Sequence, residues 1–309
     1  MVSVLLLQTL VTVLQNISMA LLVGTLMAHC WLEPPRTRAP GAGSRLLDRT
    51  GRATIIAALL LHAAALWLQS ALMAEVPLSA AAGAIAQVLT GSHFGQMWIA
   101  GMAALLVLAT LQWRGNVSVP LQWVGALALA GFALSRAEVS HAAADASVYW
   151  PVAIEALHWL LISSWTGSIV VAGWIVLPTA PLETVSERVA CLAYAKRLSS
   201  VATTALAGIL VTGGISAWRE IGAAAHWIDS GWSQLLALKL ALVAVAIGLG
   251  GLNRWRGLPA LQQALTSIGD GCRRARRRFV LVLRVESILF GVILLVAANL
   301  SSSVPPAAG

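Results

Sequence analysis

The chain has 309 residues, of which 59% are hydrophobic and only 10% are charged. This composition is that of an integral membrane protein and excludes a soluble globular domain. A formal net charge of +8 would suit a nucleic-acid ligand, but the basic residues gather in alternate connections between apolar runs. We therefore assign them to membrane topology and lipid head groups and expect no nucleic-acid partner. The predicted fold class is an all-α, polytopic membrane helical bundle.

Apolar runs long enough to cross a bilayer, which takes about 20 residues in a helix, occur eight times along the chain. We predict eight transmembrane helices, at residues 3–30, 53–73, 94–113, 119–140, 151–178, 196–218, 232–254 and 279–300. The connections are too short for a soluble domain. Residues 1–309 are therefore expected to form a single integral membrane domain, with four helices in residues 1–140 and four in residues 151–306.

The distribution of Lys and Arg predicts the orientation, because cytoplasmic loops carry an excess of both. Seventeen of the 20 basic residues lie in or beside the odd-numbered connections, whereas the even-numbered connections hold only Arg136 and Arg219. Both termini should therefore face away from the cytoplasm. Cys30, Cys191 and Cys272 then lie at or near the cytoplasmic face, where thiols stay reduced. They form no C-x-x-C pair, so neither a zinc site nor a disulfide framework is indicated.

Two Glu-x-x-His pairs flank the turn between the fourth and fifth predicted helices: Glu138 with His141, and Glu155 with His158. Residues three apart share one helical face. With Pro151 in the first turn, Glu155 and His158 lie about 6 Å and about 10 Å below the outer boundary, at about 1.5 Å per residue. Ionisable groups at that depth are costly and seldom incidental. The short turn makes the two helices antiparallel neighbours, so the two pairs can share one site.

Three other histidines leave alternatives open. His93 and Met97 are four residues apart at the start of the third predicted helix, and imidazole with thioether suits copper, above all Cu(I); the alternative is a rim histidine beside a core methionine. His62, near the centre of the second helix, is either hydrogen-bonded to a neighbouring helix or has a metal, haem or proton-relay role. His226 in the last outer loop is read as a surface histidine. Glu286 follows Arg284 by two residues, and a local ion pair is its simplest account.

The second half of the chain carries a series of motifs in a fixed order. They are Arg197-Leu198-Ser199, Leu210-x-Thr212-Gly213, Leu235-Leu236-Ala237-Leu238-Lys239-Leu240, Gly251-Leu252-Asn253-Arg254, and Arg284-Val285-Glu286 leading to Pro305-Pro306. Earlier motifs are Phe94-Gly95 with Trp98, Ser140-His141-Ala142-Ala143, and His158 followed by Trp165-Thr166-Gly167. Together, over about residues 87–306 and most closely over 195–306, they resemble the CopD family of copper-resistance membrane proteins. Leu198 in place of an aromatic residue, Ser140 in place of a glycine, and the lack of a basic residue after Trp98 depart from the family pattern.

The resemblance implies a multi-pass copper transporter of the bacterial inner membrane with a role in copper homeostasis and resistance. In that membrane, the orientation predicted from Lys and Arg makes both termini periplasmic. It also implies a copper ion received from a small periplasmic CopC-like carrier, with import toward the cytoplasm as the commoner proposal. We expect no enzymatic activity. The candidate copper ligands are His158, His141, His93, Met97, Glu155 and Glu138. His158, supported by Glu155, is expected to be the innermost ligand of the outer half.

Two other functions remain open from the sequence. The first is a haem-binding membrane electron carrier or reductase, in which histidines at similar depth such as His62 and His158 supply the axial ligands. A Soret band in the absorption spectrum of the purified protein would favour it. The second is a scaffold or assembly factor for another membrane complex, which would keep its function after replacement of all outer-half histidines.

Overall fold

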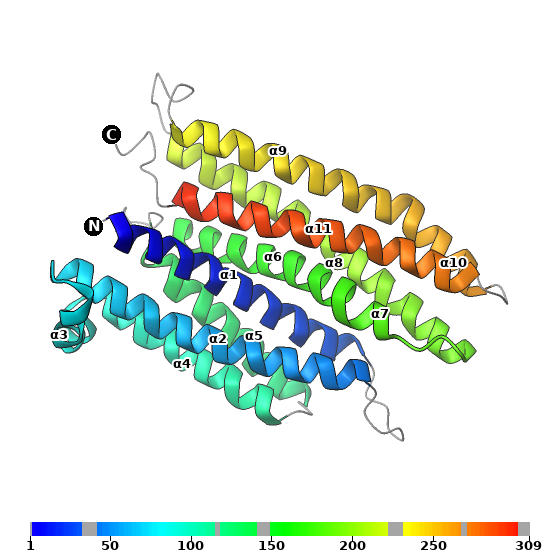
Figure 1. Cartoon of the computed structure of the whole chain (residues 1–309), viewed down its shortest axis with the longest axis horizontal. Coiled ribbons are helices and arrows are strands. Elements are labelled where there is room, and N and C mark those ends of the chain that lie inside the picture. The colour runs from blue at the N-terminus through cyan, green and yellow to red at the C-terminus, as the bar shows by residue number, and fades with distance from the viewer. Residues whose placement is uncertain are drawn as a thin grey trace. The chain divides into compact units, whose positions relative to one another are not determined.

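The computed structural model describes residues 2–32, 42–114, 118–140, 149–221, 231–266 and 271–301, and these ranges contain helices and no β-strand. Figure 1 shows the helices in chain order: α1 (Val2–Trp31), α2 (Ala42–Met73), α3 (Ile85–Gly91), α4 (His93–Arg114), α5 (Val119–Ala137), α6 (Trp150–Val171), α7 (Leu177–Thr179), α8 (Val185–Ile221), α9 (Gly231–Leu252), α10 (Leu258–Thr266) and α11 (Gly271–Ser301). The predicted all-α class is confirmed.

Within the described ranges, seven helical segments are long and apolar enough to cross a membrane. They are Leu6–Trp31, Gly43–Met73, His93–Arg114, Trp150–Thr179, Val185–Arg219, Gly231–Leu265 and Gly271–Leu300, and each coincides with a predicted span. The remaining prediction, residues 119–140, coincides with α5, a 19-residue helix that contains Gln122 and Arg136 and is not among these seven segments. The chain is thus a multi-pass membrane protein, while the count of eight spans and the side of the termini stay predictions.

The contacts divide the chain into two compact units. Unit 1 comprises Met1–Met19, Arg52–Leu161 and Gly208–Glu220, and unit 2 comprises Ala20–Gly51, Ile162–Ala207 and Ile221–Gly309. Each unit contains segments from both halves of the sequence, and α1, α2, α6 and α8 each contribute residues to both units. In unit 1, α4 and α5 lie side by side (Figure 1), and each has a fully buried side chain, Leu105 in α4 and Phe132 in α5.

Unit 2 contains α9 and α11 side by side (Figure 1), and in it α1 touches α6 through glycines. A Cβ added at Gly24 would overlap the carbonyl group of Gly167, and one added at Gly167 would overlap the carbonyl oxygen of Ala20. Small residues of this kind let helix backbones approach closely within a membrane, where dispersion contacts drive helix association. This stretch of α1 therefore packs on α6 by backbone contact.

Two π-helical turns, Ala172–Val176 and Asn253–Gly257, interrupt the helices of unit 2, and Pro178 and Pro259 follow them. Proline has no N–H and its ring collides with the carbonyl four residues earlier, so the helix widens ahead of it. In π geometry the Gly173 carbonyl would need the N–H of residue 178, which proline lacks.

Arg284 of α11 satisfies that carbonyl. Its Nε donates to the Gly173 oxygen at 3.1 Å, and its guanidinium carbon lies 4.8 Å from the ring centroid of Trp174. Arg284 therefore binds the π-helical turn of the neighbouring helix. It replaces the missing backbone donor to Gly173 and stacks on the ring of Trp174.

Candidate functional site

His158, the residue expected to lie deepest, is buried in unit 1 and contacts Thr212 of α8. Its Nδ1 lies 2.7 Å from Thr212 Oγ1, and that hydroxyl donates to the Gly208 carbonyl, also at 2.7 Å. A hydroxyl has a single proton, so we assign the imidazole Nδ1–H as the donor to Thr212. When the ring is neutral, this tautomer has its lone pair on Nε2, and a lone pair on imidazole nitrogen is what binds copper.

Glycines on α8 make room for this part of α6. A Cβ added at Gly213 would lie 2.9 Å from His158 Cε1, and one added at Gly208 would lie 2.6 Å from Leu161 Cδ1. Both distances are shorter than real Cβ contacts, so only glycine lets α8 approach the imidazole this closely. Gly214, by contrast, has no atom within 4 Å of an added Cβ. The Thr212-Gly213 pair therefore holds the imidazole through a hydrogen bond and a steric fit.

Glu155, one turn from His158 on α6, faces the same side of α8. Ser216 Oγ donates to Glu155 Oε2 at 3.5 Å, a long hydrogen bond. Arg136 of α5 supplies an opposite charge close enough to interact with this carboxylate. The Arg136 Nη1 also donates to Gln15 Oε1 at 2.9 Å, so its position is fixed by α1 as well. Glu155 thus has polar neighbours on two other helices.

The carboxylate of Glu138, which the sequence pairs with His141, lies next to His93 at the start of α4. His93 Nε2 lies 3.5 Å from Glu138 Oε2, with the two side chains 58% and 28% exposed. The partner that Glu138 has in the structure is therefore His93, whereas His141 lies outside the described residues. Met97 is partly buried one turn farther along α4. An imidazole and a carboxylate thus meet at this end of unit 1.

His62 is hydrogen-bonded to two neighbouring helices, which was one of the two accounts open from the sequence. Its Nδ1 lies 3.1 Å from Gln15 Nε2, and its Nε2 lies 3.1 Å from the Trp98 carbonyl oxygen. The Trp98 indole donates to the His62 carbonyl at 2.8 Å and stacks on the imidazole with 5.1 Å between ring centroids. Both ring nitrogens are engaged, so an axial haem bond would have to break one of these contacts. His226 lies outside the described residues.

Over the described part of the chain, no three or more His, Cys, Asp or Glu side chains are grouped closely enough to hold a metal ion. The structure pairs His93 with Glu138, and it gives His158 and Glu155 separate partners on α8. A single site shared by all the candidate ligands stays a prediction. Thr212, which the sequence offered only as part of a motif, is the partner of His158 that the motifs did not indicate.

The sequence matches two protein-family models. One, described as "Copper resistance protein D-like, N-terminal domain", matches residues 1–150, and the other, described as "Copper resistance protein D", matches residues 192–300. The chain belongs to the copper resistance protein D family. The resemblance read from the motifs is confirmed, and the first model extends it to the N-terminus. Searches of curated proteins and of solved structures gave no match.

Membership makes this CopD-family chain a membrane protein of copper resistance and copper transport. The two matched regions hold most of the residues discussed above. Thr212 and Gly213 lie in the second region and His93 and Glu138 in the first, whereas Glu155 and His158 fall between them. The family match therefore supports a role in copper handling. Evidence for a role of His158 comes only from its own surroundings.

Proposed function

We propose that this protein carries copper across a bacterial inner membrane toward the cytoplasm and thereby contributes to copper homeostasis and resistance. Copper is the transported substrate, delivered by a CopC-like periplasmic carrier. The observation that carries the proposal is the imidazole of His158. It is buried in a membrane helix, and its Nδ1 lies 2.7 Å from Thr212 Oγ1. With Nδ1–H as the donor, the neutral ring has its lone pair on Nε2.

The route begins with the groups nearest the periplasmic ends of their helices. His93, Met97 and Glu138, with His141 three residues farther along the sequence, offer imidazole, thioether and carboxylate ligands. Several weak sites in succession let an ion enter and still leave. The 3.5 Å contact between His93 and Glu138 supports this reading, since a loose, partly exposed pair can open for an incoming ion.

His158 is the deeper ligand of this route, and its neighbours have supporting roles. The hydrogen bond to Thr212 fixes the ring orientation and tautomer, as the partners of metal-binding histidines commonly do. The carboxylate of Glu155, one turn away, offsets part of the charge of the ion. Neither group needs to bind copper to be required for its passage.

Removal of the imidazole tests the proposal. His158→Ala is expected to abolish copper uptake and to remove one bound copper, measured by metal analysis of protein purified with and without added copper. Glu155→Gln should weaken uptake and binding less, because the amide still forms hydrogen bonds. His29→Ala is the matched control, since His29 of unit 2 already pairs with Asp48 at 3.3 Å. Full copper stoichiometry and wild-type uptake in His158→Ala would refute the proposed site.

A further inference from the structure

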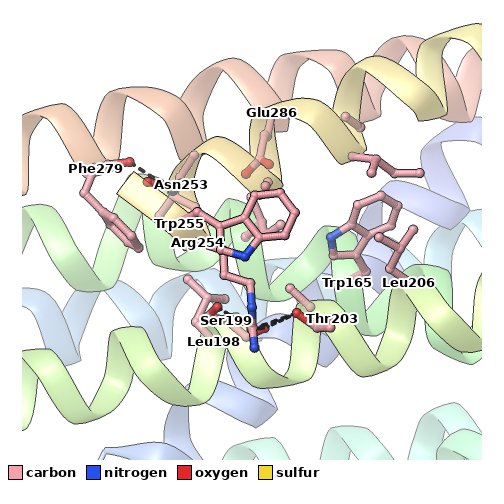
Figure 2. A pocket seen from close by; sticks show the side chains of 17 residues that line it. Trp165, Leu198, Ser199, Thr203, Leu206, Asn253, Arg254, Trp255, Phe279 and Glu286 are labelled. Carbon is pink, nitrogen blue, oxygen red and sulfur yellow. Dashed lines mark hydrogen bonds between the residues drawn. The ribbon is translucent and has the colours of Figure 1, made fainter. Parts of the chain in front are cut away.

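Unit 2 contains a cavity of about 200 Å³ lined by α6, α8, α9, the π-helical turn Asn253–Gly257 and α11. Figure 2 shows Glu286 pointing from α11 into this cavity, with Arg254 lying against α8. The wall is largely apolar, and its polar side chains are few. They are Ser199, Thr203, Asn253, Arg254, Glu286 and the indoles of Trp165 and Trp255. None of the proposed copper ligands belongs to it.

Glu286 has a buried carboxyl oxygen without a partner. Its side chain is 1% exposed, and Oε1 accepts no hydrogen bond. The local ion pair with Arg284 that the sequence suggested is wrong, because Arg284 bonds to the Gly173 carbonyl and stacks on Trp174. Space next to Oε1 is kept open by a glycine, since a Cβ added at Gly250 would lie 3.0 Å from this oxygen.

The other charged residue lining the cavity does not neutralise Glu286. Arg254 Nη1 donates to the Ser199 carbonyl at 3.1 Å, to Ser199 Oγ at 2.9 Å and to Thr203 Oγ1 at 2.9 Å. The lining residues from α6, α8 and α9 include no titratable group, and from α11 only Glu286. An ionised carboxylate without a counter-charge is strongly disfavoured in such surroundings, whereas a neutral carboxylic acid is tolerated.

A second oxygen without a partner lines the same cavity. Asn253 Oδ1 is buried and accepts no hydrogen bond, while its Nδ2 donates to the Phe279 carbonyl at 3.5 Å. Asn253 is the first residue of the π-helical turn, and such turns occur often at functional sites. Two buried oxygens at this cavity, Glu286 Oε1 and Asn253 Oδ1, therefore have no hydrogen-bond partner.

We propose that Glu286 is a proton-binding site that exchanges its proton through this cavity, and that the proton is the coupling ion of transport. In the step, hydronium gives a proton to the Glu286 carboxylate, which becomes a carboxylic acid while water is released; the reverse step returns the proton. The coupling role rests on the copper transport proposed above. The binding site itself stands on the cavity and the unpartnered oxygens.

The ligand chemistry favours a proton over a metal ion. No thiol, thioether or imidazole lines the cavity, so copper would find no soft ligand there. A hard cation such as Ca²⁺ takes about six to eight oxygen ligands, far more than this apolar wall offers, whereas a proton needs a single oxygen.

Labelling of the full-length protein with dicyclohexylcarbodiimide, an apolar reagent that attacks protonated carboxyl groups, tests the site. We expect one stable adduct, mapped by mass spectrometry to the α11 peptide, that forms more slowly as the pH is raised and is absent in Glu286→Gln. Gly250→Ala should slow labelling, because its methyl group occupies the space beside Oε1. Gly248→Ala is the matched control on the same helix, with no atom within 4 Å of an added Cβ, and should label like the wild type.

Other outcomes would overturn the assignment. They are no adduct on Glu286 in folded protein, labelling that is independent of pH, or protection by sodium chloride relative to choline chloride, which would mean that a metal cation occupies the site. Coupling is measured separately, as copper uptake into proteoliposomes with and without an imposed pH gradient. Glu286→Gln should lose the response to the gradient. A retained response would refute coupling, whereas wild-type protein that binds the reagent but moves no copper would refute the transport function and leave the proton site standing.

Discussion

Gly213→Ala tests whether the imidazole of His158 is held against α8. The new methyl carbon would lie 2.9 Å from His158 Cε1, whereas carbon atoms in contact prefer about 3.5–4.0 Å. The ring must therefore move by about 0.6–1 Å, which strains its 2.7 Å hydrogen bond to Thr212. Overpacking costs about 1–3 kcal/mol and a lost hydrogen bond about 0.5–1.5 kcal/mol. Alanine is about 1 kcal/mol more favourable than glycine in a helix, which offsets part of this cost. The net destabilisation is therefore about 0.5–3.5 kcal/mol.

Gly214→Ala is the control next to it in the chain. No atom lies within 4 Å of its added Cβ, so it should gain the propensity term alone. Thermal unfolding of both variants in the same detergent, at one scan rate because unfolding of such proteins is commonly irreversible, measures the difference. Bound copper should fall in Gly213→Ala and stay unchanged in Gly214→Ala. Equal midpoints and equal copper contents in the two variants would show that the His158 ring is not held against Gly213.

Two further predictions concern topology and the outer ligands. Cys30 is the one exposed cysteine among three, since Cys191 and Cys272 are buried. An impermeant maleimide should therefore modify Cys30 in inside-out vesicles and not in intact cells. Labelling from the periplasmic side would contradict the predicted orientation. Met97→Leu keeps the side-chain volume nearly constant but removes the thioether, so copper uptake should fall while the unfolding midpoint changes little. Unchanged uptake would assign Met97 to core packing.

The sequence predicted the membrane segments well because the thickness of the bilayer dictates the length of an apolar run. It predicted the helix ends less well. The α2 helix begins at Ala42 and α8 at Val185, each about three turns before the predicted apolar span at residues 53 and 196. Backbone hydrogen bonding continues through charged residues outside the apolar layer, and hydropathy does not detect this extension.

The candidate site was predictable only in its local parts. Depth along α6 singled out His158, but its partner Thr212 lies 54 residues away, and which helix faces meet depends on packing. The error at Glu286 has a simpler cause: residues two apart point to different sides of a helix, so Arg284 was badly placed to pair with it. The true partner of Arg284 is a carbonyl left without a donor by Pro178, a consequence that no charge pattern displays.

The number of residues in the π-helical turn Asn253–Gly257 determines how the following helix, α10, is rotated relative to α9. Such a turn holds one residue more than an α-helix uses for the same advance, so the side chains before and after it are out of phase by about 100°. Deleting one of the residues 254–257 would turn α10 by about this angle relative to α9, so the buried Leu261 and Leu265 of α10 would lose their present neighbours. Among homologous chains, a one-residue gap here would therefore mark those in which α10 packs through a different face, even where every charged residue is the same.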